Sequence, residues 1–115
     1  MNLYAEALGG ALVVYLQEER LDAAIAIRFK DRMREVTAQP SSRVVLDLSD
    51  VTFLDSSGLG AIVAVMKSLA PARQLELVGL TPTVEKVFRL TRMDTVFRIH
   101  PNVAAATSER LRDAG

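Results

Sequence analysis

Apolar residues along the chain follow a pattern that predicts two strands at the N-terminus. They recur with strand character over residues 2–8 and 11–17. The dipeptide Gly9-Gly10 between these segments is typical of a tight turn. We therefore expect the chain to open with an antiparallel hairpin.

The next apolar residues are spaced as in a helix. Ile25, Phe29 and Met33 recur at steps of four, which predicts a helix over residues 22–38. Asp22 has a side chain suited to capping the N-terminus of this helix. After it, the pattern predicts strands over 44–48, 75–78 and 96–99, and helices over 57–69, 82–91 and after Pro101.

Strands that alternate with helices after an opening hairpin are typical of the α/β class. We predict a single domain over residues 1–115, with a mostly parallel sheet of about four or five strands, an antiparallel N-terminal hairpin strand and about four helices. The strand over 44–48 shows little alternation, so it should be central. Loops 18–22, 49–58 and 79–83 should meet at the carboxyl ends of the strands, where α/β sheets bind their ligands and partners.

The turn Asp55-Ser56-Ser57-Gly58-Leu59-Gly60 joins a buried strand to an amphipathic helix. It places serine hydroxyls at a helix N-terminus, where free N–H groups and the helix dipole favour negative charge. Two interpretations are open. Either Ser56 or Ser57 caps the helix, or one of them accepts a phosphate, although no arginine lies in segment 44–60 to neutralise it.

Composition excludes several classes of function. Among 115 residues, 14 basic side chains balance 14 acidic ones, so we expect no nucleic-acid partner. The chain has no cysteine, which excludes disulfides and thiolate chemistry. The apolar run 11–16 is far shorter than the roughly 20 residues that span a membrane. With no basic region typical of a signal peptide at the N-terminus, we expect a cytoplasmic protein without direct membrane insertion.

No catalytic motif is visible in the sequence. The nucleophile elbow of hydrolases and the glycine-rich nucleotide loops are missing, so we expect neither an enzyme nor a cofactor. The neighbouring acids Asp47, Asp50 and Asp55 lack histidine support, and we expect no metal site. For the single histidine, His100, we predict a capping or surface role.

Segment 44–69, with the Asp55–Gly60 turn at its centre, resembles the phosphorylation-site segment of STAS domains of the anti-sigma-factor antagonist family. The resemblance continues through Leu77-Val78-Gly79-Leu80-Thr81-Pro82 and covers about residues 13–99. It implies a binding protein that sequesters an anti-sigma factor, which is a serine kinase with a histidine-kinase-like ATPase fold. The resemblance further implies that the kinase phosphorylates Ser56, that the phosphorylated antagonist dissociates from it, and that a phosphatase restores the unmodified serine.

The resemblance also implies which residues contact the partner. These are Asp22, Asp55, Ser56, Ser57, Gly58 and Leu59. An alternative is an accessory STAS subunit of a membrane transport system for lipids or anions. A small-ligand sensor is a third interpretation and requires an apolar pocket between the loops. The exposed first strand could also pair two copies into a homodimer.

Two positions depart from the pattern of this family. Loop 18–22 lacks the family's glycine, and its Arg20 puts a positive charge where the partner should bind. After the helix over 82–91, Arg92 stands where the family often has glycine. Because arginine is disfavoured in the left-handed backbone conformation, we expect this helix to end in a different way.

Overall fold

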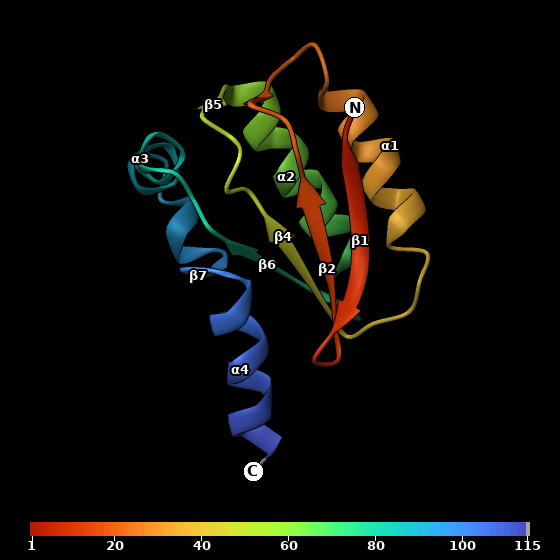
Figure 1. Cartoon of the computed structure of the whole chain (residues 1–115). Helices are drawn as coiled ribbons and strands as arrows, with labels where there is room; N and C mark the ends of the chain where they lie inside the picture. The colour runs from red at the N-terminus through yellow and green to blue at the C-terminus, as the bar shows by residue number, and fades with distance from the viewer. Residues whose placement is uncertain (115) are drawn as a thin grey trace.

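A five-stranded sheet forms the centre of the structure (Figure 1), a computed structural model that describes the backbone of residues 1–114 and the side chains up to residue 108. The strand order is β1 (Leu3–Leu8), β2 (Ala11–Leu16), β4 (Arg43–Asp47), β6 (Gln74–Val78) and β7 (Arg98–His100). Strand β1 is antiparallel to β2, and the other pairs are parallel. The predicted class, hairpin and central strand are confirmed.

Helices cover both faces of this sheet (Figure 1). Helices α1 (Ala26–Val36) and α2 (Ser56–Leu69) pack side by side on one face, where Phe29, Leu46 and Ile62 are fully buried. Helix α4 (Val103–Ala114) covers part of the other face. Helix α3 (Pro82–Leu90) and the short 3-10 helix η1 (Met93–Thr95) complete the edge near β7.

Helix α1 begins at Ala26, later than predicted, and Asp22 does not cap it. The Asp22 carboxylate accepts a hydrogen bond from the Ala24 N–H at 3.0 Å, and its carbonyl accepts one from the Ile25 N–H at 3.1 Å. Asp22 therefore stabilises a separate turn. This turn follows a short strand, β3 (Arg20–Leu21), which the apolar pattern did not reveal.

Arg92 adopts the left-handed conformation, with φ 61° and ψ 16°, so the expectation of a different end for α3 was wrong. Hydrogen bonds on both sides hold this turn. The Arg92 N–H donates to the Arg89 carbonyl at 3.2 Å, and the Arg92 carbonyl accepts from the Thr95 N–H, also at 3.2 Å. The last strand starts at Arg98, later than predicted, because η1 occupies the residues before it.

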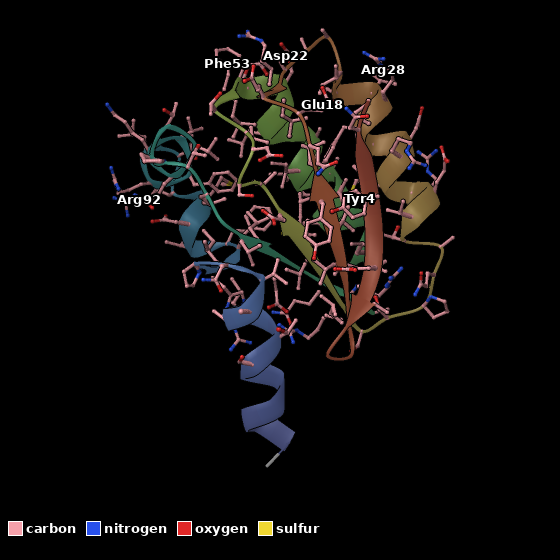
Figure 2. The ribbon with its side chains drawn as sticks, viewed as in Figure 1. Tyr4, Glu18, Asp22, Arg28, Phe53 and Arg92 are labelled. Carbon is pink, nitrogen blue, oxygen red and sulfur yellow. The ribbon has the colours of Figure 1, made fainter. Side chains whose placement is uncertain are left out.

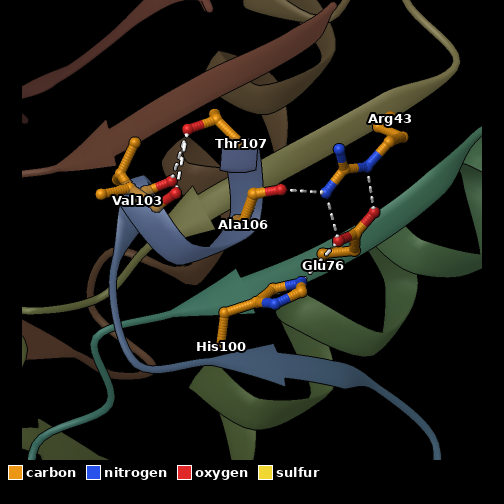
Figure 3. A network of polar contacts seen from close by, with 7 residues as sticks. Arg43, Glu76, His100, Val103, Ala106 and Thr107 are labelled. Atoms are coloured by element: carbon orange, nitrogen blue, oxygen red, sulfur yellow. Dashed lines mark hydrogen bonds and ion pairs between the residues drawn. The ribbon is translucent and has the colours of Figure 1, made fainter. Parts of the chain in front are cut away.

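A buried ion network links three strands to α4 (Figure 3). The Arg43 guanidinium donates two hydrogen bonds to Glu76, from Nε at 2.6 Å and from Nη2 at 2.7 Å. His100 Nε2 lies 2.7 Å from Glu76 Oε1, and Arg43 Nη2 also donates to the Ala106 carbonyl at 3.0 Å. Glu76 is 0% exposed and His100 7%, so the predicted capping or surface role of His100 was wrong.

Candidate functional site

The three predicted loops do meet at one edge of the sheet. The Thr52 and Phe53 N–H groups both donate to the Glu19 carbonyl, at 2.8 and 3.1 Å. The Thr81 hydroxyl donates to the Val51 carbonyl at 2.7 Å. In addition, strand β3 pairs in parallel with the short strand β5 (Phe53–Leu54), a second sheet that was not predicted. The bonds to Glu19 and the β3–β5 pairing hold the segment before α2 against loop 18–22, and the Thr81 bond holds loop 79–83 against the same segment.

Gly58 allows the start of α2 to approach β3 closely. A Cβ atom at position 58 would stand 2.1 Å from the Leu21 carbonyl oxygen and 2.8 Å from Leu54 Cδ1. Atoms cannot come this close, so position 58 admits only glycine in this arrangement. At Gly60, by contrast, nothing lies within 4 Å of an added Cβ. The first of the two glycines therefore fixes the position of the helix, and the second is not needed for packing.

Asp55 is the residue that caps α2. Its Oδ1 accepts a hydrogen bond from the Gly58 N–H at 2.8 Å, and its Oδ2 accepts one from the Ala23 N–H at 3.1 Å. The interpretation that Ser56 or Ser57 caps the helix was therefore wrong. An aspartate one residue earlier already has the extended backbone that a cap requires.

The capping interactions keep Asp55 ionised. The Gly58 N–H lowers the pKa of the Asp55 carboxyl below its ordinary value, against the opposing effect of burial. The Ala23 and Ser57 N–H groups and the positive charge of Arg20 lower the pKa further. The residue immediately before the two serines is thus a stable negative charge.

Ser56 and Ser57 are the first two residues of α2, and both side chains are exposed. Since Asp55 supplies the cap, their hydroxyls are not required to hold the helix. The next two predicted contact residues are less accessible, because Gly58 is buried and Leu59 packs partly against the core. That these residues contact a partner stays a prediction.

Arg20 brings a positive charge to this site from β3. Its Nε lies 3.1 Å from Asp22 Oδ2, and its guanidinium carbon lies 4.0 Å from the centre of the Phe53 ring. Figure 2 shows Phe53 and Asp22 at the same end of the molecule, beside the start of α2. Sequence reasoning did not identify Phe53, because only the β3–β5 pairing places it next to Arg20.

A shallow recess at this edge does not fit the small-ligand interpretation, which requires an apolar pocket. Apart from Ala24 and Ile25, it is lined by polar or charged side chains, namely Asn2, Gln17, Glu18, Glu19, Arg20 and Asp22. Within the described part of the chain, no group of three or more acidic or histidine side chains could hold a metal ion. None of the helices described is long and apolar enough to cross a membrane.

The fold and the arrangement at the start of α2 define a STAS domain. The family model of the STAS domain matches residues 2–106, so the chain belongs to this family. The anti-sigma-B factor antagonist of Listeria monocytogenes is 32% identical over 81 residues, which cover 69% of this chain and 70% of that protein. A protein named a putative anti-sigma factor antagonist, from Thermotoga maritima, is 35% identical over 69 residues. This match spans 59% of the chain and 61% of the Thermotoga protein, less than two thirds of its length.

Solved structures show the same fold. An anti-sigma factor antagonist from Mycobacterium paratuberculosis matches with a TM-score of 0.80 and 25% identity, over 97% of this chain and 92% of that one. A murine anion transporter, Solute Carrier 26 family member A9, matches with a TM-score of 0.81 over 93% of this chain and 18% of its own. Its sequence identity is only 18%, so this second match shows the fold alone.

Proposed function

We propose that this protein is an anti-sigma-factor antagonist, a binding protein controlled by phosphorylation of Ser56. The observation that carries the proposal is the exposed Ser56 hydroxyl at the N-terminus of α2, where Asp55 already supplies the cap. A hydroxyl that the fold does not need is available for modification. The names of the Listeria and Thermotoga relatives support the same role.

The partner in this proposal is an anti-sigma factor that is also a serine kinase with a histidine-kinase-like ATPase fold. The Ser56 oxygen forms a bond to the γ-phosphorus of ATP, the bond from that phosphorus to the leaving ADP oxygen breaks, and the hydroxyl proton passes to a base of the kinase. A phosphatase reverses the change by transferring the phosphoryl group to water. The exchange takes place in the cytoplasm, where ATP is available.

A phosphate on Ser56 weakens the complex through charge. It adds about 1.5 to 2 negative charges to a surface that had accepted a neutral hydroxyl, next to ionised Asp55. An increase of about 2.7 kcal/mol in the binding free energy already weakens an interaction about a hundredfold. Asp22, Asp55, Ser56, Ser57, Gly58 and Leu59 form the proposed contact surface.

The alternative of an accessory subunit in a membrane transport system is supported by the shared fold alone. No side-chain arrangement described above favours it over the antagonist. The experiment below tests it as well, because such a subunit needs no kinase that transfers phosphate to Ser56.

The proposal is tested with the purified histidine-kinase-like ATPases encoded in the same genome. Each is titrated with the unmodified protein by calorimetry, then supplied with ATP, and the phosphorylated residue is mapped by mass spectrometry. We expect one ATPase to bind at about micromolar concentration. It should phosphorylate the wild-type protein and Ser57→Ala, but not Ser56→Ala. Binding by none of these ATPases, or phosphate found on Ser57, would overturn the proposal.

A further inference from the structure

We propose that Arg20 is the internal counter-ion of a phosphate on Ser56. On phosphorylation, the Arg20 guanidinium leaves Asp22 and the Phe53 ring and pairs with the phosphate. The inference rests on the proposed function only in taking Ser56 as the modified residue. It deepens that function, because the modification then changes the contact surface at a second place besides Ser56.

The first support is the position of Arg20 in the fold. Strand β3 pairs with β5 so that Arg20 stands opposite Phe53, three residues before Ser56. The loop that follows Arg20 is fastened to the residue before Ser56 from two sides. The Asp55 N–H donates to the Leu21 carbonyl at 3.4 Å, and the Ala23 N–H donates to Asp55 Oδ2 at 3.1 Å. Arg20 and Ser56 are thereby held at the same corner of the molecule.

The second support is the loose attachment of the Arg20 side chain. It is 61% exposed, and its hydrogen bond to a described residue runs from Nε to Asp22 at 3.1 Å. The Asp22 side chain is 17% exposed, but the arginine side of the pair lies mostly in water, which screens the attraction between the two charges and weakens it. A phosphate offers three acceptor oxygens and more charge, and it binds the planar guanidinium in a bidentate manner. The phosphate is therefore the stronger partner for Arg20.

The third support is the charge distribution around Ser56. Asp55, at the cap, and Asp22, in the loop after β3, place carboxylates at this corner, and Glu19 is exposed next to Arg20 in sequence. A phosphate dianion added to these groups meets repulsion, and the guanidinium offsets part of it. The positive charge of Arg20 already acts on Asp55, the immediate neighbour of Ser56.

Moving Arg20 also changes what a partner would contact. In the unmodified protein, the guanidinium covers one face of the Phe53 ring, which is 37% exposed. Once Arg20 pairs with the phosphate, this ring face is uncovered and Asp22 loses its ion pair. The phosphorylated surface thus differs in both charge and apolar area.

The test introduces phosphoserine at position 56 during translation, so that no kinase is required. Phosphorus NMR measures the second pKa of the phosphate in three proteins that carry phosphoserine at position 56. One has no further substitution, one carries Arg20→Gln and one carries Arg34→Gln. Arg34 is a matched control, an exposed arginine near the end of α1 whose ion-pair partner is Asp31.

We expect Arg20→Gln to raise the second pKa of the phosphate by about 0.5 to 1 unit, because the arginine favours the dianion. The control Arg34→Gln should leave this pKa unchanged. In addition, the NMR signal of Arg20 Nε should shift on phosphorylation. The inference would be overturned if the phosphate pKa were the same with and without Arg20→Gln and the NMR signal of Arg20 Nε did not shift on phosphorylation. Because no kinase takes part, this outcome is independent of whether a partner kinase exists.

Discussion

The carbonyl oxygen of Leu21 lies 2.1 Å from the place that a Cβ atom on Gly58 would occupy. This contact joins β3 to the first turn of α2 and sets the position of the helix N-terminus that carries Ser56. A side chain at position 58 would separate the two elements. The shape of the candidate site therefore depends on a residue that has no side chain.

Replacement of Gly58 by alanine should destabilise the protein by about 1–3 kcal/mol, since the added methyl group meets backbone that cannot move freely. Gly60→Ala is the matched control. It lies in the same helix with open space around it, and alanine there should stabilise the protein by about 0.5–1 kcal/mol. Urea unfolding of both variants measures the difference. Equal effects at the two positions would contradict the role assigned to Gly58.

Glu76→Gln should lower the free energy of unfolding by about 3 kcal/mol. The substitution removes the carboxylate charge that the Arg43 guanidinium, whose side chain is only 13% exposed, contacts through two hydrogen bonds. In the native protein, burial raises the pKa of Glu76, but the hydrogen bonds and charges of Arg43 and His100 outweigh it and bring the pKa below its ordinary value.

Glu85→Gln provides the comparison for Glu76, because Glu85 and its partner Arg89 are both 61% exposed. Its effect on chemical unfolding should stay below about 0.5 kcal/mol. A loss at Glu76 no greater than the loss at Glu85 would show that the buried network does not hold the strands together.

Arg92→Gly should stabilise the protein by about 0.5–1 kcal/mol. Glycine adopts the left-handed conformation of this residue without the steric penalty of a Cβ atom, and part of that gain is offset by its greater freedom in the unfolded chain. Arg92→Ala keeps the Cβ atom and should give no such gain. Thermal unfolding of the two variants distinguishes relief of backbone strain from loss of the arginine side chain.

Tyr15 should ionise only at high pH. Its hydroxyl donates a hydrogen bond to Glu6 Oε1 at 2.6 Å, and this bond, followed by burial and the Glu6 charge, raises the pKa of Tyr15 from 10.0 to about 12. Since the folded-state pKa is the higher one, the stabilisation is present below about pH 10 and is lost as the pH rises through about 12.

Spectrophotometric titration of the tyrosines measures this shift. Glu6→Gln should move the Tyr15 transition toward 10, whereas Glu85→Gln on α3 should leave it unchanged. A Tyr15 transition that does not respond to Glu6→Gln would show that this hydrogen bond is not its cause.

Much of the architecture could be predicted from local pattern. The helical spacing of Phe29 and Met33, the Gly9-Gly10 turn and the largely apolar segment 44–48 each depend on neighbours a few residues away. Such short-range regularities are set by backbone geometry, so they can be recognised in the sequence without knowledge of the fold. The resemblance of the Asp55–Gly60 turn to STAS domains was also found at this level, and the family assignment is confirmed.

The tertiary structure alone decided which individual side chains of distant segments lie next to one another. Strands β3 and β5 have two residues each, too few for any periodicity to be visible, yet their pairing brings Arg20 to Phe53 and Asp22. The sequence therefore showed a serine at a helix N-terminus, whereas the fold showed that Asp55 caps this helix and that Arg20 stands nearby.

The buried network of Arg43, Glu76 and His100 also depends on pairing between strands that are distant in the sequence. Glu76 is 33 residues from Arg43 and 24 from His100 along the chain, and only the parallel register of β4, β6 and β7 brings them together. Sequence by itself determined the longer helices and strands and the segment that carries Ser56, because those depend on local periodicity. The partners of Arg20, Asp55 and His100 depend on strand pairing over long distances, which the packing of the whole chain decides.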